Sequence, residues 1–210
     1  MKFLHAWFLI CFAWVAALQG TSKSLYEKGG GFAPDERVLY KKAFGKKEKT
    51  AEELDLEFFY PDGFAKTDSR SCIVFFFGGG WTGGSTSQFY PQSEYLASRG
   101  MVAICAQYRR SLKKAKPVWC VEDARSCMRF LRKNASALGL DPKGIAAGGG
   151  SAGGHLAAAA ATISAFDCKD DDRSVSAVPN ALVLFNPVFD NSPKGFGHDR
   201  LRKDYKKFSP

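Results

Sequence analysis

One stretch decides the fold of this chain, Gly148-Gly149-Gly150-Ser151-Ala152-Gly153-Gly154-His155. A short apolar run, 145–147, precedes it, and a nearly all-alanine run, 156–161, follows it. An apolar run, a glycine-crowded turn and a run of strong helix formers predict a strand, a sharp turn and a helix. Because the residues beside Ser151 are small, the serine can occupy a strained backbone conformation at the apex of the turn.

The serine and its neighbours also carry a chemical pattern. Gly149 and Gly153 flank Ser151 in the G-x-S-x-G spacing of a nucleophile elbow. The N-terminus of the following helix would present free N–H groups and a partial positive charge where an oxyanion forms. The same pattern also fits a glycine-rich turn that binds nothing or cradles a phosphate, so the surrounding chain has to decide between these interpretations.

Strand and helix patterns alternate along the rest of the chain. We expect strands over 37–44, 54–60, 72–77, 101–106 and 181–185, the first two an antiparallel edge pair and the others buried. We expect helices over 89–98, 117–138 and from Ser151 to about 164, the first two closed by Gly100 and Gly139. This order predicts an α/β fold, a mostly parallel sheet with helices on both faces. Ligands in such sheets bind at the carboxyl ends of the strands, where Gly78 to Trp81 and Ser151 would lie.

The first residues have the pattern of a secretory signal. Lys2 precedes an apolar run over 3–18 that ends among small residues. We therefore expect a signal peptide over 1–20, a flexible lead-in over 21–36 and a single domain over 37–210. This predicts a secreted or periplasmic protein without stable membrane association after cleavage; a retained membrane anchor is the alternative.

Composition narrows the choice of partners. The net charge is +9, but no basic motif is interleaved with aromatic residues, so we expect solvated basic faces and no nucleic-acid partner. The cysteines after the predicted signal are odd in number and lack zinc-like spacing, so we expect no metal and no cofactor, and one disulfide remains an option. The acidic residues of 167–173 are expected to form a solvated loop, and 190–210 a polar tail of weak periodicity.

The two glycine motifs, each after a buried strand, together resemble a known family. The residues that carry the likeness are 76–81 (Phe-Phe-Gly-Gly-Gly-Trp), 107–109 (Gln-Tyr-Arg), Asp141-Pro142 and 146–156. They resemble the α/β-hydrolase esterases and lipases with an HGGG-type loop, the hormone-sensitive-lipase-like branch, and more narrowly the feruloyl- and acetylxylan-esterase-like proteins, over about 52–190. The resemblance implies that Ser151 is the nucleophile. It also implies that the oxyanion is bound by the N–H groups of Gly79, Gly80 and Ala152.

The sequence departs from this family in two places. Phe77 stands where the family has a histidine that helps to fix the glycine loop. The family's catalytic Asp and His follow Ser151 in later β–α units, about two of which are missing here, so we expect a C-terminally truncated chain with an exposed sheet edge beside 182–185. Among the residues present, Asp190 and His198 have the right order for a triad but too little chain between them. His155, one helical turn after Ser151, is expected to be structural.

Three functions are consistent with these observations. The first is a secreted serine hydrolase of carboxylic esters, acting on acylated carbohydrate or another small ester through an acyl-enzyme at Ser151. The second is a truncated, catalytically inactive fragment without the Asp and His of the triad. A serine peptidase of the same fold is the third, and a panel of peptides and esters would separate it from the first.

Overall fold

The computed structural model describes residues 31–44, 51–110 and 116–210. The chain divides into two units, residues 1–31 and 32–210, and the second contains every helix and strand reported below. The predicted signal peptide and most of the predicted lead-in lie outside the described residues, and their boundaries stay predictions. No helix in the described part of the chain is long and apolar enough to cross a bilayer.

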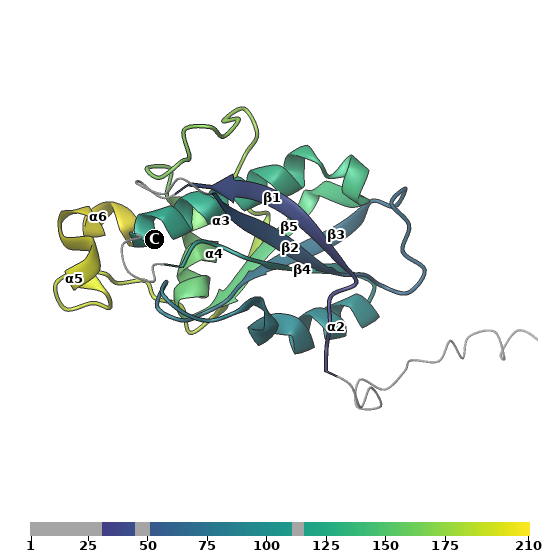
Figure 1. Ribbon diagram of the computed structural model, residues 1–210, viewed down its shortest axis with the longest axis horizontal. Helices are drawn as coiled ribbons and strands as arrows, with labels where there is room; N and C mark the ends of the chain where they lie inside the picture. The colour runs from purple at the N-terminus through teal and green to yellow at the C-terminus, as the bar shows by residue number, and fades with distance from the viewer. Residues whose placement is uncertain (1–30, 45–50, 111–115) are drawn as a thin grey trace, which may run out of the picture. The chain divides into compact units, whose positions relative to one another are not determined.

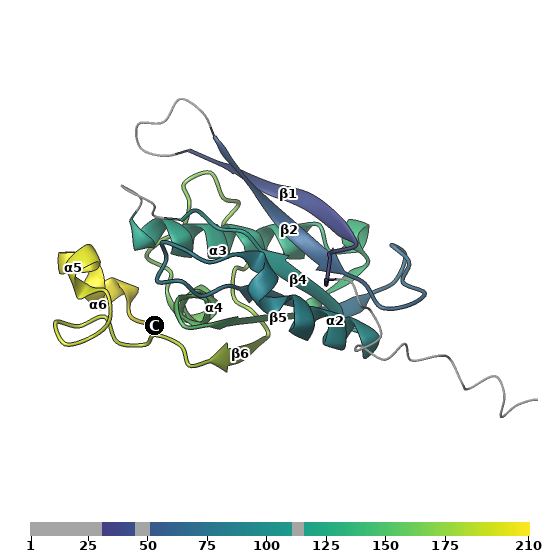
Figure 2. The ribbon, with the colours of Figure 1, turned by 60° about the horizontal axis from the view of Figure 1, so that its bottom comes forward.

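A sheet of six strands forms the centre of the second unit, in the order β1-β2-β4-β3-β5-β6. The strands are β1 (Glu36–Ala43), β2 (Glu52–Phe59), β3 (Arg70–Phe76), β4 (Val102–Ala106), β5 (Leu140–Gly150) and β6 (Ala181–Phe185). β1 and β2 are antiparallel to each other, β2 is antiparallel to β4, and the remaining neighbours are parallel. β1 and β6 are the two edges of the sheet (Figure 2). The predicted antiparallel pair and mostly parallel sheet are therefore confirmed.

Helices cover both faces of this sheet, as the alternating pattern predicts (Figure 1). The helices of the structure are α2 (Tyr90–Ser98), α3 (Pro117–Lys133), α4 (Ala152–Thr162), α5 (His198–Leu201) and α6 (Tyr205–Phe208), with 3₁₀ turns at Thr86–Phe89, Ser136–Leu138 and Arg202–Asp204. The larger core cluster joins one face to α3 and α4, and a smaller one joins the other face to α2. The burial of a continuous set of apolar side chains on each face supplies the main driving force for this arrangement.

The longest helix ends earlier than its apolar periodicity indicates. α3 stops at Lys133 because Asn134 leaves the helix and its side-chain amide donates to the Phe130 carbonyl oxygen (2.8 Å). A 3₁₀ turn then leads to Gly139, whose φ of 68° closes the segment as predicted. The apolar face continues through the 3₁₀ turn, so spacing alone did not reveal the break.

The expectation of solvated basic faces is wrong for α3. Arg125 and Arg129 are buried, and both form ion pairs with Asp167, at 2.6 and 2.7 Å. Arg129 also contacts Asp171 (3.0 Å). Burial acts to raise the pKa of Asp167, but hydrogen bonds from the two arginines outweigh it and hold that pKa below its usual value. These ion pairs hold the acidic loop against α3, so the expectation of a loop surrounded only by solvent is wrong.

Two predictions about the last third of the chain also need correction. β6 is not buried: it pairs only with β5, and Leu182, Val183 and Phe185 remain 39%, 41% and 42% exposed. The tail after it is not featureless, because α5 and α6 bury Leu201 and Phe208 against the larger core cluster. The cysteines of the described residues are free thiols, so the disulfide that the sequence allows is absent from them.

Candidate active site

Ser151 lies where β5 turns into α4, and its backbone is strained. It is the N-cap of α4 with φ 53° and ψ −119°, a region that favours glycine. Three backbone hydrogen bonds hold this conformation: its N–H donates to the Phe185 carbonyl oxygen (3.0 Å), and its own carbonyl accepts from His155 (3.0 Å) and Val188 (3.3 Å). The sharp turn predicted from the flanking glycines is therefore present.

The two flanking glycines also allow β3, β5 and α4 to approach one another. A Cβ at Gly153 would lie 1.9 Å from the Phe76 carbonyl oxygen at the end of β3. A Cβ at Gly149 would lie 2.5 Å from the same oxygen. Neither position can hold a larger residue without moving a strand or the helix, so these glycines bring the end of β3 next to the start of α4.

The glycine loop after β3 lies directly beside the serine. A Cβ at Gly78 would lie 3.4 Å from the Ser151 Cβ atom. Gly79 and Gly80 come next, with φ of 130° and 59°, conformations that glycine adopts without strain. In the described part of the chain, no hydrogen bond uses the N–H group of Gly79, Gly80 or Ala152. These three N–H groups are thus unused in the described residues, and their role as an oxyanion hole stays a prediction.

Side chains hold the start of this loop although Phe77 replaces the histidine. The Tyr108 hydroxyl donates to the Phe77 carbonyl oxygen (2.7 Å), and the two rings stack with centroids 4.2 Å apart. The Gln88 side-chain oxygen accepts from the Gly78 N–H (2.6 Å). Gln88 could not be predicted from the sequence, because it lies in the short 3₁₀ turn before α2 where no periodicity or motif marks it.

His155 is a buried residue of the core. Its Nε2 donates to the Phe208 carbonyl oxygen (2.8 Å), and its ring stacks on that of Phe208 and meets the Trp81 ring edge-on. Burial disfavours the charged form and lowers the pKa of His155 to about 4, so it is neutral near pH 7. Its Nδ1 has no partner among the described residues. These contacts agree with the structural role expected for His155.

Asp190 and His198 are occupied by local contacts. The Asp190 carboxylate accepts hydrogen bonds from the Ser192 N–H (2.8 Å) and hydroxyl (3.0 Å). His198 Nδ1 contacts the Asn191 carbonyl oxygen (3.0 Å), and its ring packs against Tyr205. Within the described ranges, no hydrogen bond joins Asp190 to His198, or either histidine to the Ser151 hydroxyl.

The C-terminal segment also contacts the glycine loop, which the sequence did not indicate. Arg200 Nη1 donates to the Gly80 carbonyl oxygen (2.6 Å), and the Phe196 ring packs against Trp81 at 5.7 Å. Trp81 itself is fully buried with a φ of 62°. The loop that carries the predicted donors is therefore held by β3 on one side and by the tail on the other.

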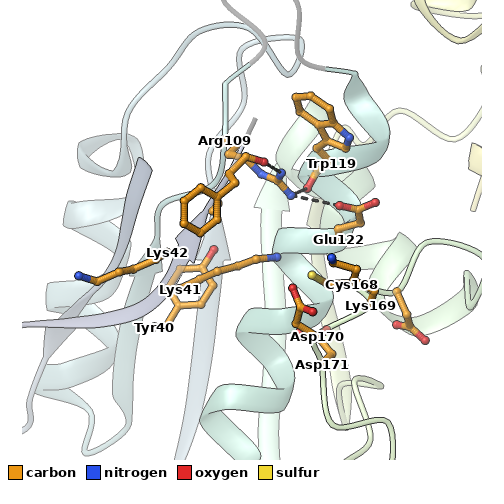
Figure 3. Close-up of a pocket in the computed structure, with 13 residues that line it drawn as sticks. Tyr40, Lys41, Lys42, Arg109, Trp119, Glu122, Cys168, Lys169, Asp170 and Asp171 are labelled. Atoms are coloured by element: carbon orange, nitrogen blue, oxygen red, sulfur yellow. Dashed lines mark hydrogen bonds and ion pairs between the residues drawn. The ribbon is translucent and has the colours of Figure 1, made fainter. Parts of the chain in front are cut away.

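A large pocket lies elsewhere on the sheet and does not include Ser151. It measures about 930 Å³, and β1, the start of α3 and the acidic loop form it (Figure 3). Arg109 lines it and is neutralised by Glu122 (3.1 Å) and by the buried Asp123 (2.8 Å). β1 is separated from β5, the strand that leads into Ser151, by β2, β4 and β3. In the parts of the chain that the structure describes, there is no group of three or more His, Cys, Asp or Glu side chains arranged so that they could hold a metal ion.

The fold and the site together define the class of protein. A mostly parallel sheet, a strained serine between strand and helix, and a glycine loop beside it are the features of an α/β-hydrolase. A profile of the BD-FAE family matches residues 56–191, and the chain belongs to that family.

Individual relatives agree with this assignment. Esterase 2 from Thermogutta terrifontis, in its apo form, is 41% identical with a TM-score of 0.77, over 86% of this chain and 67% of that one. A probable carboxylic ester hydrolase, LipM, from Mycobacterium tuberculosis is 36% identical over 85 residues, 40% of this chain and 20% of LipM. An AB hydrolase superfamily protein from Schizosaccharomyces pombe is 32% identical over 101 residues, 48% of this chain and 29% of that protein. The chain thus spans less than a third of these two curated relatives.

Proposed function

We propose that this protein hydrolyses carboxylic esters and that Ser151 is the nucleophile. The Ser151 oxygen bonds to the ester carbonyl carbon, its proton passes to a base, and the carbonyl electron pair moves onto the oxygen. Collapse of this tetrahedral species expels the alcohol and leaves an acyl-enzyme, which water then hydrolyses. The N–H groups of Gly79, Gly80 and Ala152 stabilise the oxyanion, each contributing about 3 kcal/mol to the transition state.

One observation carries this proposal: the strained backbone of Ser151 beside the glycine loop. A non-glycine residue at φ 53° costs about 1–3 kcal/mol, and such strain persists mainly at functional sites. Ser151 lies at the apex of the turn beside Gly78, and no hydrogen bond in the described residues uses the N–H groups of Gly79, Gly80 and Ala152, which supports their proposed role. The names of the relatives, esterase 2 and LipM, support the same chemistry.

A second candidate function is ester binding without turnover. It is favoured by the lack of any hydrogen bond between Ser151 and a histidine in the described residues. A serine needs a base to lose its proton, so a site without one would bind esters but react slowly.

Labelling with paraoxon separates the two functions. Attack by Ser151 on its phosphorus releases p-nitrophenolate and leaves a diethylphosphoryl group on the serine. For the hydrolase, we expect one label per chain on the peptide that contains Ser151, and none in Ser151→Ala. An unlabelled wild-type chain that still binds a non-hydrolysable ester analogue would support the binding function.

We also propose that the protein is exported and that its substrates are acylated carbohydrates or other small esters. The apolar run over residues 3–18 supports export, and the resemblance of the glycine motifs to feruloyl- and acetylxylan-esterase-like proteins supports the substrate class. Rates on acetylated xylan, ethyl ferulate and p-nitrophenyl acetate would test the second point. A preference for peptides over all three would contradict it.

A further inference from the structure

A single peptide group at the start of the glycine loop is held at both of its polar atoms by side chains. The Phe77 carbonyl oxygen accepts from the Tyr108 hydroxyl at 2.7 Å. The Gly78 N–H, which belongs to the same peptide, donates to Gln88 Oε1 at 2.6 Å. Because a peptide is planar, two hydrogen bonds on its opposite edges fix the rotation of the whole plane.

The orientation of this plane matters because the next two residues of the loop are glycines. Gly79 and Gly80 have positive φ and no side chains, and the hydrogen bonds that reach them go to their carbonyl oxygens, from the Thr82 and Gly83 N–H groups and from Arg200. The Phe77–Gly78 peptide precedes these two glycines, and side chains bond to both of its polar atoms. Its N–H is already bonded to Gln88, whereas no hydrogen bond in the described residues uses the N–H groups of Gly79 and Gly80.

Gln88 is well placed to act as a fixed support. It lies in the 3₁₀ turn Thr86–Phe89, and its own N–H donates to the Ser85 carbonyl oxygen (3.2 Å). The next residue, Phe89, is buried and stacks on Phe75 with ring centroids 4.8 Å apart. Phe77 has no hydrogen-bonding side chain, so support for the loop has to come from elsewhere.

We propose that Gln88 is a positioning residue for the oxyanion donors, holding the Phe77–Gly78 peptide together with Tyr108 so that the N–H group of the following Gly79 faces the Ser151 side. This inference rests on the proposed function. Gln88 acts through the backbone of the loop and has no assigned contact with substrate.

The test compares Gln88→Met, which keeps the length but removes the acceptor, with Gln88→Glu, which restores one. Gln92→Met is the matched control, since Gln92 is exposed and forms no hydrogen bond with the loop in the described residues. In isotope-labelled protein, we expect the Gly78 amide to exchange at least about tenfold faster in Gln88→Met alone, with shifted Gly79 and Gly80 amide signals. In p-nitrophenyl acetate hydrolysis we expect kcat to fall about tenfold, with KM and the thermal midpoint unchanged.

The two readouts keep the proposals separate. A wild-type chain without turnover counts against the proposed function, and the exchange and signals of the loop amides then decide on Gln88. Unchanged Gly78 exchange in Gln88→Met overturns the role of Gln88. An active wild type with equal kcat in Gln88→Met also overturns it, even where Gly78 exchange rises.

Discussion

Ser151 is held in a backbone conformation that its side chain disfavours. Its φ of 53° and ψ of −119° lie outside the regions open to residues with a Cβ. Hydrogen bonds to Phe185, His155 and Val188 hold it there. The strained backbone of Ser151 therefore lowers the free energy of unfolding, and it also holds the hydroxyl at the apex of the turn.

We predict that Ser151→Gly is more stable than Ser151→Ala, by about 1 kcal/mol. Both variants lose the hydroxyl, but glycine alone relieves the strained φ. Urea unfolding of the two proteins measures the difference. Equal stabilities, or a more stable alanine variant, would show that the turn stores no strain.

The buried His155 makes stability depend on pH. Its pKa is lowered from 6.5 to about 4 in the folded chain, because burial disfavours the imidazolium. Between these pH values the unfolded chain binds a proton that the folded chain does not, so the unfolding free energy falls as pH falls. This residue alone accounts for a loss of about 3 kcal/mol between pH 7 and pH 4.

We expect His155→Gln to remove that part of the pH dependence. Other groups also make stability fall in acid, among them Asp167 with its lowered pKa, so the comparison is the slope of unfolding free energy against pH in the two proteins. A shallower slope in the variant between pH 6.5 and 4 is the expected result. Parallel slopes would mean that His155 titrates normally in the folded state.

At the scale of elements, the site depends on close contact between α4 and the end of β3. Gly153 provides this contact, with a Cβ position only 1.9 Å from the Phe76 carbonyl oxygen. Gly150, three residues earlier, is different: a Cβ there would make ordinary contacts, the nearest at 3.5 Å with Phe89. The two positions form a matched pair at the same turn.

We predict that Gly153→Ala destabilises the protein by about 3 kcal/mol, although alanine is the better helix former. Gly150→Ala should change stability by less than about 1 kcal/mol. Thermal unfolding followed by circular dichroism measures both. A Gly153→Ala variant as stable as Gly150→Ala would contradict the close helix–strand approach.

The features that could be predicted from the sequence are those that depend on neighbouring residues. β1 to β4, the end of β5 and the start of α4 could be predicted, since periodicity, apolar runs and glycines act over a few neighbouring residues. The ion pair of Arg125 with Asp167 could not, because its partners are 42 residues apart. The contact of Gln88 could not be predicted for a similar reason, because its partner Gly78 is ten residues away across a loop. Ser151 and its glycines were accessible because their chemistry is contained in five consecutive residues.

At the scale of the whole molecule, segments far apart in sequence converge on the serine. The glycine loop after β3 lies beside Ser151 at the turn after β5, and Arg200 of the tail donates to the Gly80 carbonyl oxygen of that loop across 120 residues. The large pocket beside β1 does not include Ser151 or the glycine loop among its lining residues. Function is therefore expected at the carboxyl ends of β3 and β5.

The most direct measurement is the rate of p-nitrophenol release from p-nitrophenyl acetate by the full chain and by Ser151→Ala. We predict saturable release over many turnovers by the wild type, at least about 10³-fold faster than by the variant. Equal rates for the two proteins would contradict Ser151 as the nucleophile of an ester hydrolase.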